Sequence, residues 1–201
     1  MSKIGAIVLA AGMSKRMGKP KLLLRLKGKP LFRYPLELAI RNQLSPICLI
    51  GGQYLKSFQE DSTDLMNVDF IPNPNYDLGM STSVRMGINH VKDCTDAVFI
   101  FLADQPFVPD LVIQSMTEQY CNGLRIVRPK YNGKLGHPIL IDKSLYKEFL
   151  TIDGDQGGKE IIKKYKNLTK ILSFEDSIWG MDIDTSQDFQ IGKQYSSIIT
   201  H

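Results

Sequence analysis

The chain has 201 residues, of which 43% are hydrophobic and 23% charged, so it has a globular composition and not a disordered or fibrous one. Its 25 basic and 21 acidic side chains give a net charge of +4 without a long single-sign run, which does not indicate nucleic-acid binding. The first apolar stretch is too short to span a bilayer and lacks a cleavage site, so we expect a cytoplasmic protein with no membrane partner. The three cysteines, Cys48, Cys94 and Cys121, have neither metal-ligand spacing nor the even number of a disulfide framework.

Short apolar runs rich in β-branched residues are predicted to be strands: Ile4–Ala10, Ile47–Ile50, Val68–Ile71, Ala97–Leu102 and Arg125–Val127. Stretches with helical periodicity lie between them: Pro30–Leu44, Ser81–Val91 and Pro109–Tyr120. This alternation predicts an α/β fold of the Rossmann-like, doubly wound type, with a mostly parallel sheet. The run Ala97–Leu102 is apolar throughout, as a strand covered on both faces requires, and is expected to be central.

The last third of the chain is less regular. An apolar run at Pro138–Ile141, a short helix at Lys143–Phe149 and a glycine-rich loop at Gly154–Gly158 predict a mixed region with an antiparallel edge. No repeat or linker divides the sequence, so residues 1–201 are expected to form a single domain.

The loop after the first predicted strand, Ala10–Lys21, carries two glycines and four basic side chains. In an open α/β sheet ligands bind at the carboxyl ends of strands, and small residues let backbone N–H groups approach phosphate oxygens. Arg16 and Lys21 can neutralise phosphate charge, so a triphosphate is the best-matched ligand. The spacing fits neither a dinucleotide fingerprint nor a Walker loop, and a basic surface turn is the alternative.

Two places offer carboxylates for magnesium, which takes few protein carboxylates together with phosphate oxygens and water. Asp104 follows the central strand at its carboxyl end, although an aspartate before Gln-Pro can also start a turn or cap a helix. If residues 179–185 form a strand, its alternation points Asp182 and Asp184 to one face. The same segment can instead start a helix, with Thr185 or Ser186 as its N-cap.

Taken together, these segments resemble the MobA-like nucleotidyltransferases, and most closely the molybdenum cofactor cytidylyltransferase branch and the accessory proteins of molybdenum hydroxylases. The resemblance runs from Ile7 to Phe189 through motifs in the same order. They are Leu9-Ala10-Ala11-Gly12 with Ser14, Arg16-Met17-Gly18 and Lys21, Asn73-Pro74, Gly79-Met80-Ser81-Thr82-Ser83, Ala103-Asp104-Gln105-Pro106, Gly136-His137-Pro138, and Asp182-Ile183-Asp184-Thr185 before Asp188.

The resemblance implies a fold of the nucleotide-diphospho-sugar transferase type and a role for each motif. The first loop holds the triphosphate and base through Ala10, Ala11, Gly12, Ser14 and Gly18, with Arg16 and Lys21 on the phosphates. Magnesium is expected on Asp104 and Asp184, with Asp182 a further candidate. The segment Gly136, His137 and Pro138 belongs to the acceptor side. Ser81 and Ser83 can bind base, ribose or phosphate, although cap and turn roles are equally consistent with them.

The implied activity is magnesium-dependent transfer of CMP from CTP to a phosphorylated acceptor, molybdopterin or molybdenum cofactor, with release of pyrophosphate. A phosphate acceptor is already a nucleophile, so catalysis requires alignment and charge stabilisation, which we assign to Asp104, Arg16 and Lys21. His137 can carry a proton, but a structural or acceptor-binding role is preferred. Ala11 stands where the guanylyl-transferring branch usually has glycine, which favours CTP over GTP.

Three alternatives stay open. Leu135 and Ala103 depart from the cytidylyltransferase pattern and resemble the accessory relatives, so the acceptor is not fixed. The chain could be a non-catalytic nucleotide carrier or insertion chaperone whose partner is a molybdenum hydroxylase. Transfer of GMP, or transfer to a sugar or isoprenoid phosphate, is a further possibility within the same fold.

Overall fold

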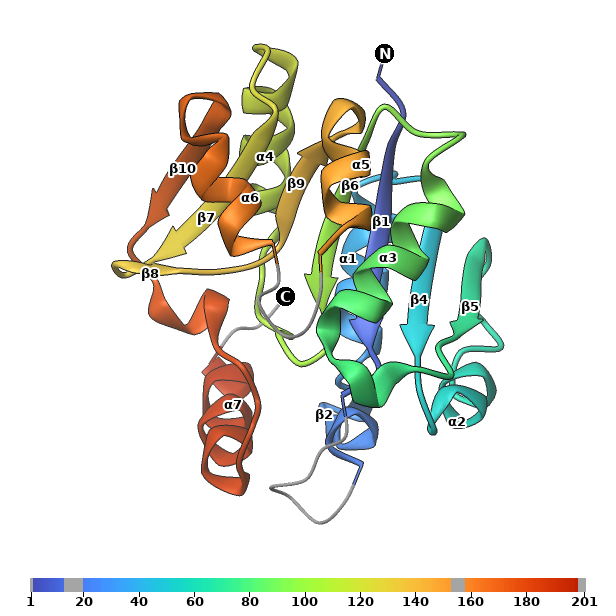
Figure 1. Ribbon diagram of the computed structural model, residues 1–201. Coiled ribbons are helices and arrows are strands. Elements are labelled where there is room, and N and C mark those ends of the chain that lie inside the picture. The colour runs from blue at the N-terminus through green and yellow to red at the C-terminus, as the bar shows by residue number, and fades with distance from the viewer. Residues whose placement is uncertain (1, 13–19, 153–157, 199–201) are drawn as a thin grey trace.

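The computed structural model describes residues 2–12, 20–152 and 158–198 (Figure 1). Its main sheet has the order β10-β7-β9-β6-β1-β4-β5, with β8 paired to β7. The strands of this sheet are β1 (Ile4–Ala10), β4 (Ile47–Gly51), β5 (Val68–Pro72), β6 (Ala97–Leu102), β7 (Ile126–Tyr131), β8 (Lys134–Leu135), β9 (Ile139–Asp142) and β10 (Thr169–Phe174). A separate two-stranded hairpin comprises β2 (Arg25–Leu26) and β3 (Lys29–Pro30).

Helices cover both faces of the sheet. The α-helices are α1 (Arg33–Arg41), α2 (Leu55–Glu60), α3 (Met80–Val91), α4 (Asp110–Cys121), α5 (Tyr146–Leu150), α6 (Lys159–Lys164) and α7 (Ser186–Ile198). The 3-10 helices are η1 (Lys21–Leu23), η2 (Tyr76–Leu78), η3 (Lys143–Leu145), η4 (Lys166–Leu168) and η5 (Ser177–Gly180). Side chains of α1, α2 and α4 pack in one hydrophobic cluster, and those of α3, α5 and α6 in another on the opposite face, which Figure 1 shows in front.

The strand alternation explains this two-layered core. Along β1, Ala6 and Val8 belong to one cluster, while Ile7 and Leu9 belong to the other. All of these side chains are buried, as expected for a strand between two helical layers. The predicted fold class is therefore confirmed, and the predicted central strand Ala97–Leu102 is β6, which pairs with β1 on one side and β9 on the other.

The position of the antiparallel strand differs from the prediction. Strand β9 runs antiparallel to both β6 and β7, and it lies between them inside the sheet and not at an edge. One edge is instead β10, which pairs parallel to β7 and was not predicted. The apolar character of β9 fits this internal place, because Ile139, Leu140 and Ile141 are all buried.

A small third cluster attaches α7 and the β2–β3 hairpin to the carboxyl end of the sheet. Leu26, Leu31, Ile183 and Phe189 form its buried centre. It thereby fixes the segment that carries Asp182 and Asp184 against the chain that follows Lys21. Within the described ranges, no helix is both long enough and apolar enough to cross a membrane.

Candidate active site

The centre of the candidate site is the ammonium of Lys21. Lys21 begins η1, and the next residue, Leu22, is buried in the core, which fixes the backbone there. Its Nζ donates to Asp104 Oδ2 at 2.7 Å and to Asp184 Oδ1 at 2.6 Å. The structure thus joins three residues predicted from separate motifs, and the two contacts span 83 and 163 positions of the chain.

The charge of Lys21 is retained by its two partners. Burial lowers the pKa of this lysine, but the negative charges and hydrogen bonds of Asp104 and Asp184 outweigh burial, so the pKa is raised overall. The lysine side chain is only 12% exposed. Such a pair of carboxylates would repel each other without a cation between them. Lys21 therefore stabilises the approach of Asp104 and Asp184.

The backbone brings the two carboxylates together. Asp104 follows β6, and Ala103 continues along β1 by donating its N–H to the carbonyl of Leu9 at 3.1 Å. Across the site, the N–H of Ile183 donates to the carbonyl of Asp104 at 3.0 Å. The side chain of Ile183 is fully buried, and its neighbours Asp182 and Asp184 both line one cavity.

The predicted strand at residues 179–185 is wrong, but its two aspartates, Asp182 and Asp184, still line one cavity. The segment begins as the 3-10 helix η5 and has no regular structure from 181 to 184. The helix-start alternative holds for the residues that follow. Thr185 Oγ1 accepts the N–H of Asp188 at 3.1 Å, and Asp188 Oδ2 accepts the N–H of Thr185 at 2.7 Å and that of Asp184 at 3.1 Å. This reciprocal cap fixes the main chain at Asp184.

Asp182 has a different environment from Asp184. The amide of Gln105 donates to Asp182 Oδ1 at 2.8 Å. Partial burial, followed by repulsion from Asp104 and Asp184, raises the pKa of Asp182 despite the Gln105 hydrogen bond and the charge of Lys21. Asp184, in contrast, shares the ammonium of Lys21 with Asp104.

The oxygen atoms at this point suit a magnesium ion. The described residues contain no preformed cluster of three or more metal-ligating side chains. However, Asp104 and Asp184 both contact the ammonium of Lys21, so their carboxylates lie close together. Magnesium bound with a nucleotide needs few carboxylates, because phosphates and water complete its coordination. The donor set fits the predicted metal through these two residues, and Asp182 lies beside it.

The predicted nucleotide loop is described only in part. Ala10 ends β1 and is buried, and Ala11 and Gly12 follow it with increasing exposure. A Cβ added at Gly12 would meet no atom within 4 Å among the described residues, so the backbone is open there. Ser14, Arg16 and Gly18 lie outside the described residues.

The serines at the start of α3 are directed inward. Asn73 is buried, and its Nδ2 donates at 2.9 Å to both Thr82 Oγ1 and Ser83 Oγ. Ser83 Oγ therefore accepts a hydrogen bond that joins the start of α3 to Asn73, after β5. Ser81 is fully buried, and its hydroxyl has no hydrogen-bond partner among the described residues.

On the acceptor side, the main chain of the predicted Gly136-His137-Pro138 segment is fixed by side chains of β7. Arg128 Nε donates to the carbonyl of Gly136 at 3.0 Å, and the hydroxyl of Tyr131 donates to the carbonyl of His137 at 2.9 Å. Gly136 is required here, because a Cβ would lie 2.5 Å from the Tyr131 ring. Burial, aided by the charge of Arg128, lowers the pKa of His137 to about 3. His137 is therefore neutral at neutral pH and unsuited to carry a proton there.

A cavity of about 730 Å³ connects the acceptor side to the carboxylates. Its lining includes Lys134, Gly136, Asp182, Asp184 and Asp188. Two of the predicted motifs, one from the β8–β9 connection and one from the segment before α7, thus border the same space. Its volume lies within the usual range of small-molecule sites.

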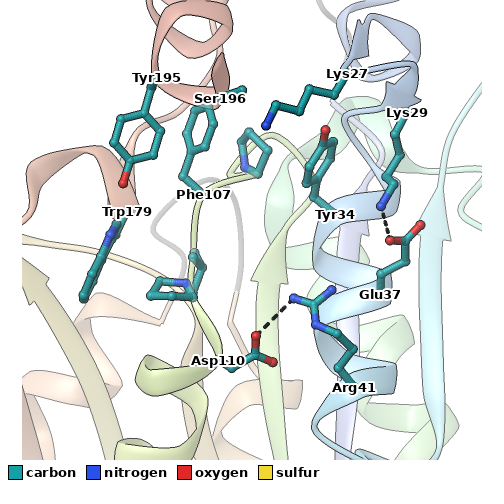
Figure 2. A pocket seen from close by; sticks show the side chains of 13 residues that line it. Lys27, Lys29, Tyr34, Glu37, Arg41, Phe107, Asp110, Trp179, Tyr195 and Ser196 are labelled. Carbon is teal, nitrogen blue, oxygen red and sulfur yellow. Dashed lines mark hydrogen bonds and ion pairs between the residues drawn. The ribbon is translucent and has the colours of Figure 1, made fainter. Parts of the chain in front are cut away.

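A second cavity of about 500 Å³ lies beside residues 106–110. Aromatic side chains line it: Tyr34, Phe107, Trp179 and Tyr195 (Figure 2). Figure 2 also shows that charged groups at its rim are paired, Lys29 with Glu37, and Arg41 with Asp110 at 3.3 Å. Lys21, the predicted phosphate-binding residue that the structure describes, does not line this second cavity.

Three residues at the site were not assigned roles from the sequence: Gln105, Arg128 and Tyr131. Gln105 lies within a quoted motif, but only the fold reveals that it contacts Asp182. A usable signal did exist for Arg128, because a charged residue directly after the apolar pair Ile126 and Val127 is unusual in an internal strand.

The mixed sheet with helices on both faces, and the contact of Lys21 with Asp104 beyond the carboxyl end of β6 and with Asp184, are typical of a Rossmann-like nucleotidyltransferase. Residues 6–168 match the model of the MobA-like NTP transferase domain, and the chain belongs to that family. It is 27% identical to the molybdenum cofactor cytidylyltransferase of Escherichia coli (strain K12) over 197 residues, which cover 96% of this chain and 97% of that protein. It is also 23% identical to the purine catabolism protein PucB of Bacillus subtilis (strain 168) over 215 residues, covering 95% and 96%.

Solved structures share the fold. The crystal structure of Rv0371c from Mycobacterium tuberculosis H37Rv has a TM-score of 0.82 and 22% sequence identity, and the match covers 96% of this chain and 98% of that one. A manganese complex of the same protein has a TM-score of 0.79, with 21% identity and coverage of 96% and 99%.

Proposed function

We propose that this nucleotidyltransferase transfers CMP from CTP to the phosphate of a molybdopterin-type acceptor and releases pyrophosphate. The observation that carries the proposal is the contact of Lys21 with both Asp104 and Asp184, next to a cavity that Gly136 also lines. The similarity to the Escherichia coli cytidylyltransferase over nearly the whole of both chains supports CTP and this acceptor class. Ala11 supports the same choice of nucleotide.

In the proposed reaction, an oxygen of the acceptor phosphate attacks the α-phosphorus of CTP. One P–O bond forms, the bond from the α-phosphorus to the β-phosphate bridge breaks, and the electron pair leaves with pyrophosphate. No side chain needs to act as a nucleophile or remove a proton, because the acceptor phosphate is already ionised. His137, which is neutral and has a lowered pKa, therefore needs no role in proton transfer.

Metal binding, triphosphate binding, charge stabilisation and acceptor binding would be carried out by different residues. Asp104 and Asp184 would hold magnesium, with Asp182 beside them, and the ion would supply charge stabilisation at the phosphates. The backbone of Ala10, Ala11 and Gly12, together with Ser14, Arg16 and Gly18, would bind the triphosphate. Lys21 would stabilise negative charge on the departing pyrophosphate. Gly136, His137 and Pro138 would form part of the acceptor site.

The proposal is tested by incubating the protein with magnesium, molybdopterin and labelled CTP and GTP in competition. We expect stoichiometric pyrophosphate and CMP-modified pterin, with CTP used in preference to GTP. Equal use of the two nucleotides would show that Ala11 carries no selectivity. Tight nucleotide binding without product would instead support a carrier that serves a molybdenum hydroxylase.

A further inference from the structure

The ammonium of Lys21 lies where a metal ion shared by Asp104 and Asp184 would have to lie. Its Nζ is 2.7 Å from Asp104 Oδ2 and 2.6 Å from Asp184 Oδ1. Magnesium binds oxygen ligands at about 2.0–2.1 Å, so an ion held by the same two oxygens would occupy the space between them, where Nζ lies. The ammonium and the ion therefore exclude each other on this pair of oxygens.

The second oxygens of the two carboxylates do not remove this conflict. The side chains of Asp104 and Asp184 are 20% and 37% exposed, so part of each carboxylate is accessible. An ion bound there would still lie close to the ammonium, and two neighbouring cations repel each other. Solvent screens this repulsion only in part, because the Lys21 side chain is largely buried. By exclusion or by repulsion, Lys21 opposes a divalent ion at these aspartates.

The two carboxylates stay close together when the ammonium leaves. The N–H of Ile183 donates to the carbonyl of Asp104, and Asp188 accepts the N–H of Asp184, so main-chain hydrogen bonds position both segments without Lys21. One ammonium leaves two carboxylates with a net negative charge, whereas a divalent ion neutralises both. The pair therefore retains an attraction for the ion that Lys21 does not fully satisfy.

The side chain of Lys21 can move although its main chain is fixed. The buried side chain of Leu22 holds the backbone in place, but a lysine ammonium is carried on a flexible four-carbon stem. Lys21 lies at the end of the predicted nucleotide loop. The phosphates of a bound nucleotide would therefore offer its ammonium another anionic partner.

We propose that Lys21 and the divalent metal ion are alternative partners of the Asp104–Asp184 pair, and that the ammonium keeps the free ion out. The inference rests on the proposed function, in which nucleotide phosphates bind the same ammonium. Its consequence is that a metal ion alone binds weakly, although both carboxylates are in place.

The test uses Mn²⁺ alone as the probe, without nucleotide, because the free ion can be counted by electron paramagnetic resonance. Its Kd is measured for wild type, Lys21→Met and the matched control Lys29→Met, which removes the same charge but from an ion pair with Glu37. We expect Lys21→Met to bind Mn²⁺ more tightly than wild type by about tenfold or more, since a competing cation is removed. Lys29→Met should bind Mn²⁺ as wild type does.

A merely structural role for Lys21 predicts the opposite result. If the lysine only held the carboxylates in place, its removal would disorder the pair and lower the affinity for Mn²⁺. Equal or weaker Mn²⁺ binding by Lys21→Met would therefore overturn the inference. The double variant Lys21→Met with Asp184→Asn should lose the gain, because one of the two carboxylates is missing. A double variant that keeps the gain would place the ion elsewhere and also overturn the inference.

The folding of the variant is followed through its thermal midpoint. Lys21→Met leaves two carboxylates without their shared ammonium, so its midpoint should be lower without metal and should rise more with Mn²⁺ than that of wild type. If Lys21→Met does not fold, Lys21→Gln replaces it, because an amide is neutral but still donates to a carboxylate. A folded Lys21→Gln protein with the Mn²⁺ affinity of wild type would equally contradict the inference.

Failure of the proposed function is distinguishable from failure of this inference. Tighter Mn²⁺ binding by Lys21→Met, without CMP transfer by wild type, would retain the competition and reject the reaction. CMP transfer by wild type, with the same Mn²⁺ affinity in wild type and Lys21→Met, would retain the function and reject the competition.

Discussion

The N–H of Ile183 donates a 3.0 Å hydrogen bond to the carbonyl oxygen of Asp104. This one contact joins the two segments that carry the carboxylates of the site, although they lie far apart in sequence. Because both partners are backbone atoms, the arrangement survives substitution of either carboxylate. The side chains at 104 and 184 can therefore be varied to test their chemistry without removing the link that brings them together.

Asp104→Asn should abolish most turnover while the protein remains folded. The substitution keeps the side-chain shape and the main-chain bond to Ile183, but it removes a charged ligand from the proposed metal site. We expect the transfer rate at limiting magnesium to fall by about a hundredfold or more, since a loss of several kcal/mol of charge stabilisation has that effect. The control is Asp110→Asn, which alters an exposed carboxylate paired with Arg41 and should leave the rate unchanged. Near-normal turnover by Asp104→Asn would refute the metal assignment.

Asp182 and Asp188 should have opposite effects on the pH dependence of stability. The raised pKa of Asp182 means that the folded state binds its proton more tightly, so stability falls as pH rises from 3.8 through the folded pKa. Asp182→Asn should therefore be more stable than wild type at pH 7, with the difference vanishing below 3.8. Solvent around Asp182 keeps this effect modest.

For Asp188 the sign reverses. Burial opposes ionisation, but hydrogen bonds from Thr185 and the N–H of Asp184 outweigh it and lower the pKa. Stability from Asp188 is present above 3.8 and lost as pH falls through the folded pKa, so Asp188→Asn should be less stable than wild type at pH 7. Urea unfolding of the two variants between pH 3 and 7 measures both effects. Changes of the same sign would contradict these environments.

Gly136→Ala should weaken acceptor binding more than nucleotide binding. The new Cβ would lie 2.5 Å from the Tyr131 ring, and Tyr131 must then move away from the His137 carbonyl that it holds. We expect a raised KM for the acceptor, an unchanged Kd for CTP and a stability loss of about 1–3 kcal/mol. Gly87→Ala is the matched control, because its Cβ would meet Ile7 at the same 2.5 Å but between α3 and β1. An equal rise in acceptor KM for both variants would show that general destabilisation is the cause.

How far the sequence predicted the fold depended on burial. The strands Ile4–Ala10 and Ala97–Leu102 were predicted with the bounds that the structure has, because both are buried and apolar almost throughout. Strand β10 was missed since it is an edge strand in which half of the residues, Lys170, Ile171 and Ser173, are exposed. Strand β7 was predicted to end at Val127, because the following Arg128 and Pro129 are untypical of an internal strand.

The candidate site was predicted in its members but not in its contacts. Asp104 and Lys21 could be singled out from local motifs, since each lies near the carboxyl end of a buried strand. The contacts could not be predicted, because they join side chains from segments that meet only after folding. Lys21 binds both Asp104 and Asp184, and Gln105 donates to Asp182. Asp182 and Asp184 do line one cavity, but the strand from which a shared face was predicted is absent, since residues 181–184 have no regular structure.

Lys21→Met separates an enzyme from a nucleotide carrier, because Lys21 has a resting role and a proposed catalytic one. In the resting structure it neutralises Asp104 and Asp184, so the variant should lose stability, and rates must be compared at a temperature where it is fully folded. If Lys21 stabilises charge that builds up on pyrophosphate, its removal should lower single-turnover transfer at saturating CTP by more than it lowers CTP affinity, since an interaction strengthened in the transition state appears in the rate. Lys29→Met, which breaks an ion pair with Glu37 outside the site, is the control and should change neither quantity. A loss of CTP affinity alone, with the transfer rate at saturation unchanged, would remove Lys21 from the chemical step and leave it a binding residue.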